Sequence, residues 1–250
     1  MTALITGASS GIGRDMAIYL GRLGWNLILV GRNEEKLKYT ASRIKTKTRI
    51  VSIDLAQSGA PQRLYKLCSD TKVDFLINNA GFGLFGEFDK TDLNSELELI
   101  DVNIKAVHIL TKLFLRDFKK RNSGRILNVA SSAAFMPGPL LSAYYASKAY
   151  VLRLSCAIAE ELKRSGSKVS ISVFCPGPVN TDFNNRAGVV FSVPPISSDY
   201  AAKYAVDGAL KRKLIIIPTV KMKLCCAFAP IVPTQLLTKA VYHIQRKKLQ

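Results

Sequence analysis

Two side chains that lie four residues apart, Tyr144 and Lys148, have the types and the spacing for acid–base chemistry. They begin a segment typical of a helix, and residues four apart share one helical face. A free tyrosine has a pKa of about 10 and is a poor base at neutral pH, whereas a neighbouring cation stabilises the phenolate and lowers that pKa. The phenol can then donate a proton to a ketone oxygen or accept one from an alcohol. Tyr145 lies three residues from Lys148 and is expected to shape the pocket instead.

A glycine-rich turn, TGASSGIG, joins the first strand-like segment to the first helix-like segment. Gly7 permits a tight turn, Gly11 lets the backbone approach a pyrophosphate, and Gly13 allows the helix to pack closely on the strand. The N-terminus of the helix offers N–H groups and a positive dipole end to phosphate. The turn therefore predicts a dinucleotide-binding site formed by Gly7, Ser9, Ser10, Gly11, Ile12 and Gly13.

The second strand-like segment ends in Val30-Gly31-Arg32-Asn33, where dinucleotide-binding folds contact the adenosine ribose. A carboxylate at this point would pair with a free ribose 2′-hydroxyl, and none is present. Gly31 leaves room, and the Arg32 guanidinium can neutralise a 2′-phosphate. This pattern favours NADP(H) over NAD(H) as the cofactor, although an ordinary arginine on a surface loop would look the same.

Alternating strand-like and helix-like segments must position these residues. The strand-like segments are short, β-branched and apolar on both faces, which is typical of a parallel sheet covered by helices on both sides. The alternation predicts an α/β fold with a doubly wound parallel sheet, whose ligands bind at the carboxyl ends of the strands. We predict strands at Ala3–Thr6, Asn26–Val30, Arg49–Ile53, Val73–Ile77, Arg125–Val129, Val169–Phe174 and Leu214–Ile217, and helices at Ile12–Leu23, Glu34–Ile44, Pro61–Cys68, Leu93–Phe118, Ser142–Lys163 and Tyr200–Lys211.

Length and composition fit one domain. The 250 residues, 48% of them hydrophobic, are enough to bury one substantial core. We expect a single domain over residues 1–250, with a substrate lid over 182–198 and a C-terminal extension over 220–250. No apolar run is long enough to span a membrane, and the chain begins almost at once with a strand rather than a signal peptide. We therefore expect a cytoplasmic protein with reduced cysteines, and no cysteine spacing resembles a metal site.

The net charge of +18 favours solubility and attracts anions such as a phosphorylated cofactor or substrate. Nucleic-acid binding is not expected, because the basic residues are scattered rather than interleaved with aromatic residues in one patch. The segment Gly208–Gln250 holds nine basic residues and no acidic residue, together with apolar runs such as Cys226–Val232. It is compatible with peripheral contact to acidic lipid or to an acidic carrier protein, or with a tail that packs on its own domain.

Four motifs, in the same order and spacing, resemble the short-chain dehydrogenase/reductase family. They are the glycine turn TGASSGIG, Asn78-Asn79-Ala80-Gly81 after the fourth strand, Tyr144-x-x-x-Lys148, and Pro176-Gly177 after the sixth strand. The resemblance covers residues 3–181 in detail and the remainder loosely. It implies a Rossmann fold, a nicotinamide cofactor, hydride transfer to or from a carbonyl carbon, and homo-oligomers formed through the two long helices.

The same resemblance implies roles at the chemical centre. Tyr144 would be the acid/base, and Lys148 would hold the nicotinamide ribose. Ser131, thirteen residues before Tyr144, would hold the substrate oxygen, since a hydroxyl at the end of a strand can stabilise developing charge; Ser132 is the alternative, one residue out of step. Asn103 would help to hold a water that links the lysine to solvent, although its amide could also cap a kinked backbone.

Further cofactor contacts follow from the resemblance alone. Val179 would offer backbone hydrogen bonds to the carboxamide, and Thr181 a hydroxyl. Asn78 and Asn79 could equally be structural and link neighbouring strands through their amides. The implied cofactor-binding residues are Asp54 and Leu55 at the adenine, Asn79, Ala80 and Gly81 on the adenosine side, and Pro176, Gly177, Val179 and Thr181 under the nicotinamide.

The family's substrate region follows this loop and is apolar here. Phe183 and Phe191, with Phe135 from the segment before Tyr144, indicate a pocket for a lipophilic ketone or a 3-oxoacyl chain, although lid packing would also explain them. Met136 and Leu141 would add to the same wall. The tail from Leu224 to Leu237 could close the pocket or meet another subunit.

Together these observations predict an NADP(H)-dependent oxidoreductase that reduces an apolar ketone or oxidises the corresponding alcohol. A cofactor-binding regulatory or scaffold protein without turnover is the alternative, and the complete set of acid–base residues argues against it. A third hypothesis is a basic protein that acts on nucleic acid or a membrane surface through Gly208–Gln250.

Overall fold

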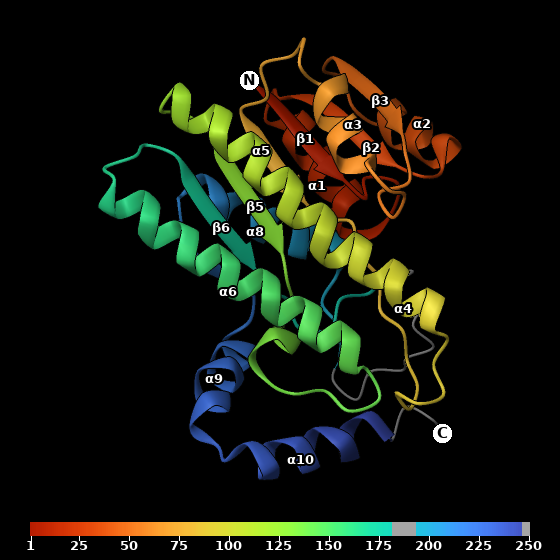
Figure 1. Ribbon diagram of the computed structural model, residues 1–250. Helices are drawn as coiled ribbons and strands as arrows, with labels where there is room; N and C mark the ends of the chain where they lie inside the picture. The colour runs from red at the N-terminus through yellow and green to blue at the C-terminus, as the bar shows by residue number, and fades with distance from the viewer. Residues whose placement is uncertain (182–193, 247–250) are drawn as a thin grey trace.

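In the computed structural model, which describes residues 1–181 and 194–246, seven parallel strands form one sheet (Figure 1). The spatial order is β3-β2-β1-β4-β5-β6-β7, so the order reverses beside β1. In doubly wound sheets, ligands bind at the carboxyl ends of the strands near such a reversal. The strands are β1 (Thr2–Thr6), β2 (Asn26–Gly31), β3 (Thr48–Ser52), β4 (Phe75–Asn78), β5 (Arg125–Val129), β6 (Ser170–Phe174) and β7 (Ile215–Ile216).

Helices cover both faces of the sheet, as the apolar strands predicted. One core contains Ala3 and Ile5 of β1, and the other contains Leu4, because successive side chains point to opposite faces of a strand. The first face is covered by α1 (Gly11–Arg22), α2 (Glu34–Ser42) and α8 (Ser198–Leu210). The second is covered by α3 (Ala60–Leu67), α5 (Val107–Lys120) and α6 (Ser142–Arg164).

The predicted elements are confirmed with small shifts at their ends, apart from the first long helix. That helix is divided into α4 (Leu93–Ile100), a π-helical turn η1 (Asp101–Ala106) and α5. A π-helical turn accommodates an extra residue, and such turns are frequent at functional sites. Here it carries the buried Asn103, whose amide bonds to the loop after β4.

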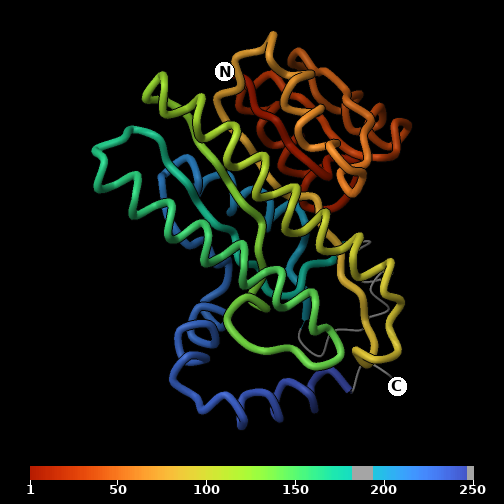
Figure 2. Tube along the Cα trace, viewed as in Figure 1, coloured from red at the N-terminus to blue at the C-terminus, as the bar shows by residue number. Residues whose placement is uncertain are grey.

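The C-terminal region forms helices that the sequence analysis did not predict. They are α9 (Val220–Phe228), the 3₁₀ turn η3 (Ala229–Ile231) and α10 (Thr234–Arg246). Figures 1 and 2 show them at the opposite end of the molecule from α2 and β3. Thr219 caps α9 by accepting a hydrogen bond from Met222 N, a local signal that was readable in advance. Within the described ranges, no helix has both the length and the apolarity needed to cross a bilayer.

Candidate active site

The turn between β1 and α1 has the geometry that its glycines predict. Gly7 and Gly11 have φ of 67° and 53°, in the left-handed region that favours glycine. A Cβ at Gly13 would lie 2.3 Å from both the Gly7 carbonyl oxygen and Asn79 Nδ2, so no side chain fits there. Ser10 precedes α1 without a side-chain cap, and the first turn of the helix holds no acidic residue. The helix N-terminus is therefore arranged to present N–H groups to an anion such as pyrophosphate.

The asparagine that ends β4, Asn78, and the one that follows it, Asn79, have structural roles. Asn79 Nδ2 donates to the carbonyl oxygens of Thr6 and Gly7 at 3.0 and 3.2 Å, which ties the glycine turn to the end of β4. Asn78 Nδ2 donates to Asn128 Oδ1 at 2.9 Å and so links β4 to β5. Asn79 also lines a cavity beside the glycine turn, whereas Asn78 is buried.

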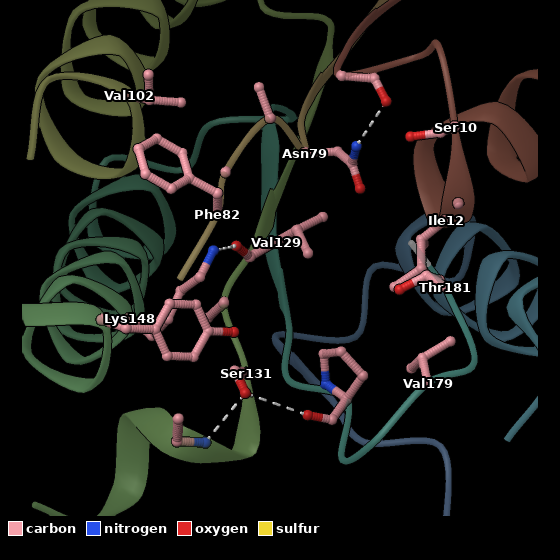
Figure 3. Close-up of a pocket in the computed structure, with 18 of the residues that line it drawn as sticks. Ser10, Ile12, Asn79, Phe82, Val102, Val129, Ser131, Lys148, Val179 and Thr181 are labelled. Carbon is pink, nitrogen blue, oxygen red and sulfur yellow. Dashed lines mark hydrogen bonds between the residues drawn. The ribbon is translucent and has the colours of Figure 1, made fainter. Parts of the chain in front are cut away.

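A cavity of about 440 Å³ runs from the glycine turn to the start of α6 (Figure 3). Figure 3 shows Ser10 and Ile12 on one side of it and Lys148 on the other. The size is within the range of ligand pockets, and an anion site at one end with an acid–base group at the other fits a nicotinamide dinucleotide. The predicted residues that line the cavity are Gly7, Ser9, Ser10, Gly11, Ile12, Arg32, Asp54, Leu55, Asn79, Ala80, Gly81, Ser131, Tyr144, Lys148, Pro176, Gly177, Val179 and Thr181.

A phenol, a hydroxyl and an ammonium group meet at the inner end of the cavity. Tyr144 and Ser131 both line this end, and the Ser131 side chain acts to lower the pKa of the Tyr144 hydroxyl. Lys148 Nζ lies 5.6 Å from the centroid of the Tyr144 ring and donates to the Val129 carbonyl oxygen at 3.0 Å (Figure 3). Ser132 also lines the cavity. Of the two candidate serines, it is Ser131 that lowers the pKa of the phenol.

Burial changes the pKa of the Tyr144 phenol more than the charge of Lys148 does. It raises the pKa of Tyr144 to about 12, although the Ser131 hydrogen bond opposes the shift. It also lowers the pKa of Lys148 to about 8. The expectation that the pKa of Tyr144 lies below that of a free phenol is therefore wrong, because the charged form of each group loses hydration in the cavity wall. Tyr144 keeps its proton at neutral pH and is suited to donate it.

Asn103 does not line the cavity, although it lies close to the chemical centre. Its Nδ2 donates to the Phe82 carbonyl oxygen at 2.9 Å and to Ser147 Oγ at 3.1 Å, and its Oδ1 accepts from Phe82 N at 3.1 Å. A Cβ at Gly81 would lie 2.9 Å from Asn103 Oδ1 and 3.3 Å from Lys148 Nζ. The amide therefore holds together the loop after β4, the π-helical turn and α6. This is the alternative role predicted for Asn103, in which its amide caps a kinked backbone.

At the adenosine end, Arg32 is already engaged by carboxylates. Its Nη1 donates to Glu98 Oε1 at 2.8 Å and lies 3.8 Å from Asp54 Oδ2. Glu98 belongs to α4, 66 residues further along the chain, so no local signal in the sequence indicated it. Lys36, in the first turn of α2, lines the same end of the cavity. A phosphate bound here would compete with Glu98 for Arg32 and would gain a second cation.

The prediction that Phe135 lines the substrate pocket is wrong. The 3₁₀ turn η2 (Ser132–Phe135) directs this ring into a hydrophobic cluster with Val151 of α6. Met136, which follows the turn, lines the cavity in its place, as does Leu141. A shift of one residue in a tight turn therefore decides whether Phe135 or Met136 faces the cavity.

The loop after β6 is described only in part. Val179 pairs with Ile196 in an isolated parallel bridge, which holds the two described ends of the loop together. A Cβ at Gly11 would lie 3.1 Å from Thr181 Cγ2, so the loop approaches the glycine turn closely. Phe183 and Phe191 lie outside the described residues.

The C-terminal helices close the substrate end of the cavity. Met222 of α9 and Val241, Ile244 and Gln245 of α10 line it, beside Tyr145. Of the two roles predicted for Leu224–Leu237, closing the pocket is wrong, since no residue of that stretch lines the cavity, and contact with another subunit stays a prediction. The inward residues Val241 and Gln245 are four apart on one face of α10, a spacing that could have indicated the true closing segment.

Comparison with known proteins identifies the family of this chain. The short chain dehydrogenase family matches residues 1–188. An uncharacterized oxidoreductase of Staphylococcus epidermidis is 36% identical over 192 residues, 74% of this chain and 83% of that protein. Human 17-beta-hydroxysteroid dehydrogenase type 3 is 35% identical over 186 residues, 72% of this chain, and the match spans 59% of that enzyme's length.

A solved structure extends the similarity beyond the motifs. A short-chain dehydrogenase from Sphingobium yanoikuyae in complex with NADPH superposes with a TM-score of 0.82 at 30% identity, over 92% of this chain and 94% of that one. The fold thus agrees with the comparisons over most of the chain. The chain belongs to the short-chain dehydrogenase/reductase family of oxidoreductases, which act on carbonyl or alcohol carbons.

Proposed function

We propose that this protein is an NADPH-dependent reductase of apolar ketones. The geometry that carries the proposal is the meeting of Tyr144, Ser131 and Lys148 at the inner end of the cavity. The bound nicotinamide would supply hydride. Ser131 orients the ketone oxygen, and Tyr144 donates a proton to that oxygen as negative charge develops on it. Lys148 places positive charge beside the phenol, which favours proton release at that moment.

The pKa of Lys148 leads to a prediction about pH. The ammonium is charged below about pH 8 and neutral above it, so its favourable field is lost as the pH rises. We expect kcat/KM for NADPH, which reports on the free enzyme, to fall as the pH passes about 8. In Lys148→Arg the cation stays charged, and any remaining activity should lose this fall. A wild-type profile that stays flat through this range would contradict the prediction.

The preference for NADPH rests on two cations at the adenosine end. Arg32 and Lys36 both line the cavity there, and the Sphingobium relative was solved with NADPH. Asp54 and Glu98 oppose the proposal, because each would repel a 2′-phosphate unless Arg32 turns from them to the phosphate. A charge-assisted bond from arginine is worth about 1.5–3 kcal/mol, and this should outweigh an exposed ion pair of at most about 1 kcal/mol.

Calorimetric titration with NADPH and NADH tests the preference. We expect NADPH to bind more tightly by at least about tenfold, and Arg32→Ala to remove most of that difference while leaving NADH binding nearly unchanged. Arg43→Ala is the matched control, because Arg43 stacks on Tyr39 and does not line the cavity. Equal binding of the two cofactors by the wild type would overturn the proposal.

An apolar substrate is supported by the walls beyond Tyr144. These walls are built largely from Met136, Leu141, Met222, Val241 and Ile244. The name of the human relative, a hydroxysteroid dehydrogenase, agrees with a lipophilic ketone. The test is the loss of NADPH absorbance in stopped flow with a panel of apolar and polar ketones. Turnover should favour apolar ketones, whereas tight NADPH binding without turnover of any ketone would support the scaffold alternative.

We also propose that the C-terminal helices contact anionic lipid. Val220, Leu224 and Phe228 lie along one face of α9 and are 70%, 55% and 59% exposed, and Ile231 of η3 is 74% exposed. We call these four residues the C-terminal apolar surface. The segment that carries this surface, residues 208–250, holds nine basic residues and no acidic residue, so charge complementarity favours an anionic bilayer over a neutral one. A lipophilic substrate could then enter from the lipid through the end that α10 closes.

Vesicle co-sedimentation tests this contact. Wild-type protein should sediment with phosphatidylglycerol vesicles at low salt, less so at high salt, and much less with phosphatidylcholine vesicles. Phe228→Glu should weaken binding strongly, whereas Tyr39→Glu, which is equally exposed on α2, should not. If Phe228→Glu left lipid binding unchanged, or instead dissociated a dimer of this chain, the surface would not be a lipid contact.

A further inference from the structure

One buried polar side chain in the substrate end of the cavity has an unused hydrogen-bonding atom. Gln245 of α10 is 3% exposed and lines the cavity. Its Nε2 donates to the Tyr145 hydroxyl at 2.5 Å, and its Oε1 has no hydrogen-bond partner among the residues that the structure describes. A buried amide oxygen without a partner is costly, and most such groups in native proteins are satisfied. Val241, one turn earlier on the same face of α10, is buried and apolar and lines the same cavity.

The partner of Gln245 is held rigidly next to the chemical centre. A Cβ at Gly138 would lie 2.2 Å from the Tyr145 ring, so the ring packs directly on that backbone. The rings of Tyr144 and Tyr145 lie edge to face with centroids 6.1 Å apart. The Tyr145 hydroxyl and the Gln245 amide therefore form a polar pair near the proton donor, within a largely apolar wall.

We propose that Gln245 and Tyr145 form a second polar subsite, which binds a hydroxyl group of the substrate. Among the described residues, the pair presents a free acceptor, the amide oxygen, and two free donors, the Tyr145 O–H and the second N–H of the amide. Exchanging the amide oxygen and nitrogen again leaves at least one free donor and one free acceptor. A hydroxyl both donates and accepts, and so complements the pair in either arrangement. The inference rests on the proposed ketone reductase and narrows its substrate class to lipophilic ketones that carry a hydroxyl group.

The experiment compares straight-chain methyl ketones that carry a hydroxyl at successive chain positions with the hydroxyl-free ketone. At one or two positions the wild type should prefer the hydroxyketone in kcat/KM by at least about tenfold, because a site built to bond a hydroxyl discriminates against its absence. Gln245→Leu should bring this ratio close to one while the hydroxyl-free ketone is still reduced. Tyr145→Phe should lower the ratio in part, and it provides a second test if Gln245→Leu does not fold.

The outcomes separate this inference from the proposed function. If ketones are reduced but no hydroxyl position is preferred, the subsite is wrong and the reductase stands. A ratio that survives both substitutions also overturns the subsite. If no ketone is reduced, the reductase proposal fails, and the subsite is then judged by calorimetric binding of the same compounds to the NADP(H)-loaded protein. A merely structural Gln245 would change the melting temperature without changing the hydroxyl preference.

Discussion

Tyr144→Phe is expected to slow ketone reduction by about 10³-fold, which corresponds to about 4 kcal/mol of lost transition-state stabilisation. The substitution removes only the hydroxyl that donates the proton. It leaves the ring, which packs with Tyr145 and Leu141, in place. NADPH affinity and thermal stability should therefore change little. Single-turnover loss of NADPH absorbance with a saturating ketone measures the chemical step directly.

The neighbouring tyrosine supplies the control for this prediction. Tyr145→Phe also removes one phenol hydroxyl at the start of α6, but that hydroxyl bonds Gln245 rather than Ser131. It should slow the reduction of a hydroxyl-free ketone by less than about tenfold, as expected for one neutral hydrogen bond. If Tyr144→Phe turned over as fast as wild type, the assignment of the proton donor would be wrong.

Gly13→Ala is expected to damage both the fold and the cofactor site. The new Cβ would lie 2.3 Å from the Gly7 carbonyl oxygen and from Asn79 Nδ2, so it would push apart the turn and the strand end that those atoms join. Overpacking of this kind costs about 1–3 kcal/mol, and contact with backbone places this variant at the upper end. The melting temperature should fall by about 5–10 °C, and NADPH binding should weaken at least about tenfold.

A glycine outside the site separates this effect from a general intolerance to substitution. Gly24 has φ of 82°, and no atom of the described part of the chain lies within 4 Å of an added Cβ. Asparagine tolerates that backbone region, so Gly24→Asn should change the melting temperature by only a few degrees and leave NADPH affinity unchanged. The close-packing argument fails if Gly13→Ala melts like wild type and binds NADPH equally well.

The amino-acid sequence by itself determined the elements and the local chemistry. Alternating apolar strands and amphipathic helices specify a doubly wound sheet, because burial on both faces leaves the strands few other arrangements. The glycine turn and the Tyr144–Lys148 pair are also local: the positions of Gly7 and Gly13 and the helical spacing of four follow from backbone geometry over a few residues. For these features the prediction and the structure agree.

Only the tertiary structure decided the environment of each group. The pKa values of Tyr144 and Lys148 depend on how deeply both are buried, which no spacing reveals, and burial reversed the expected shift of the tyrosine. Arg32 meets Glu98 from a distant helix. The direction of Phe135 depends on the register of one tight turn.

The substrate end of the cavity is also a feature that only the tertiary structure decided. Gln245 and Tyr145 are 100 residues apart in the chain and meet only because α10 folds back over the start of α6. Contacts between distant segments are set by packing, and packing depends on the shapes of all the elements together. The sequence therefore specified the reaction type, whereas the features that would select a substrate arose from the assembled fold.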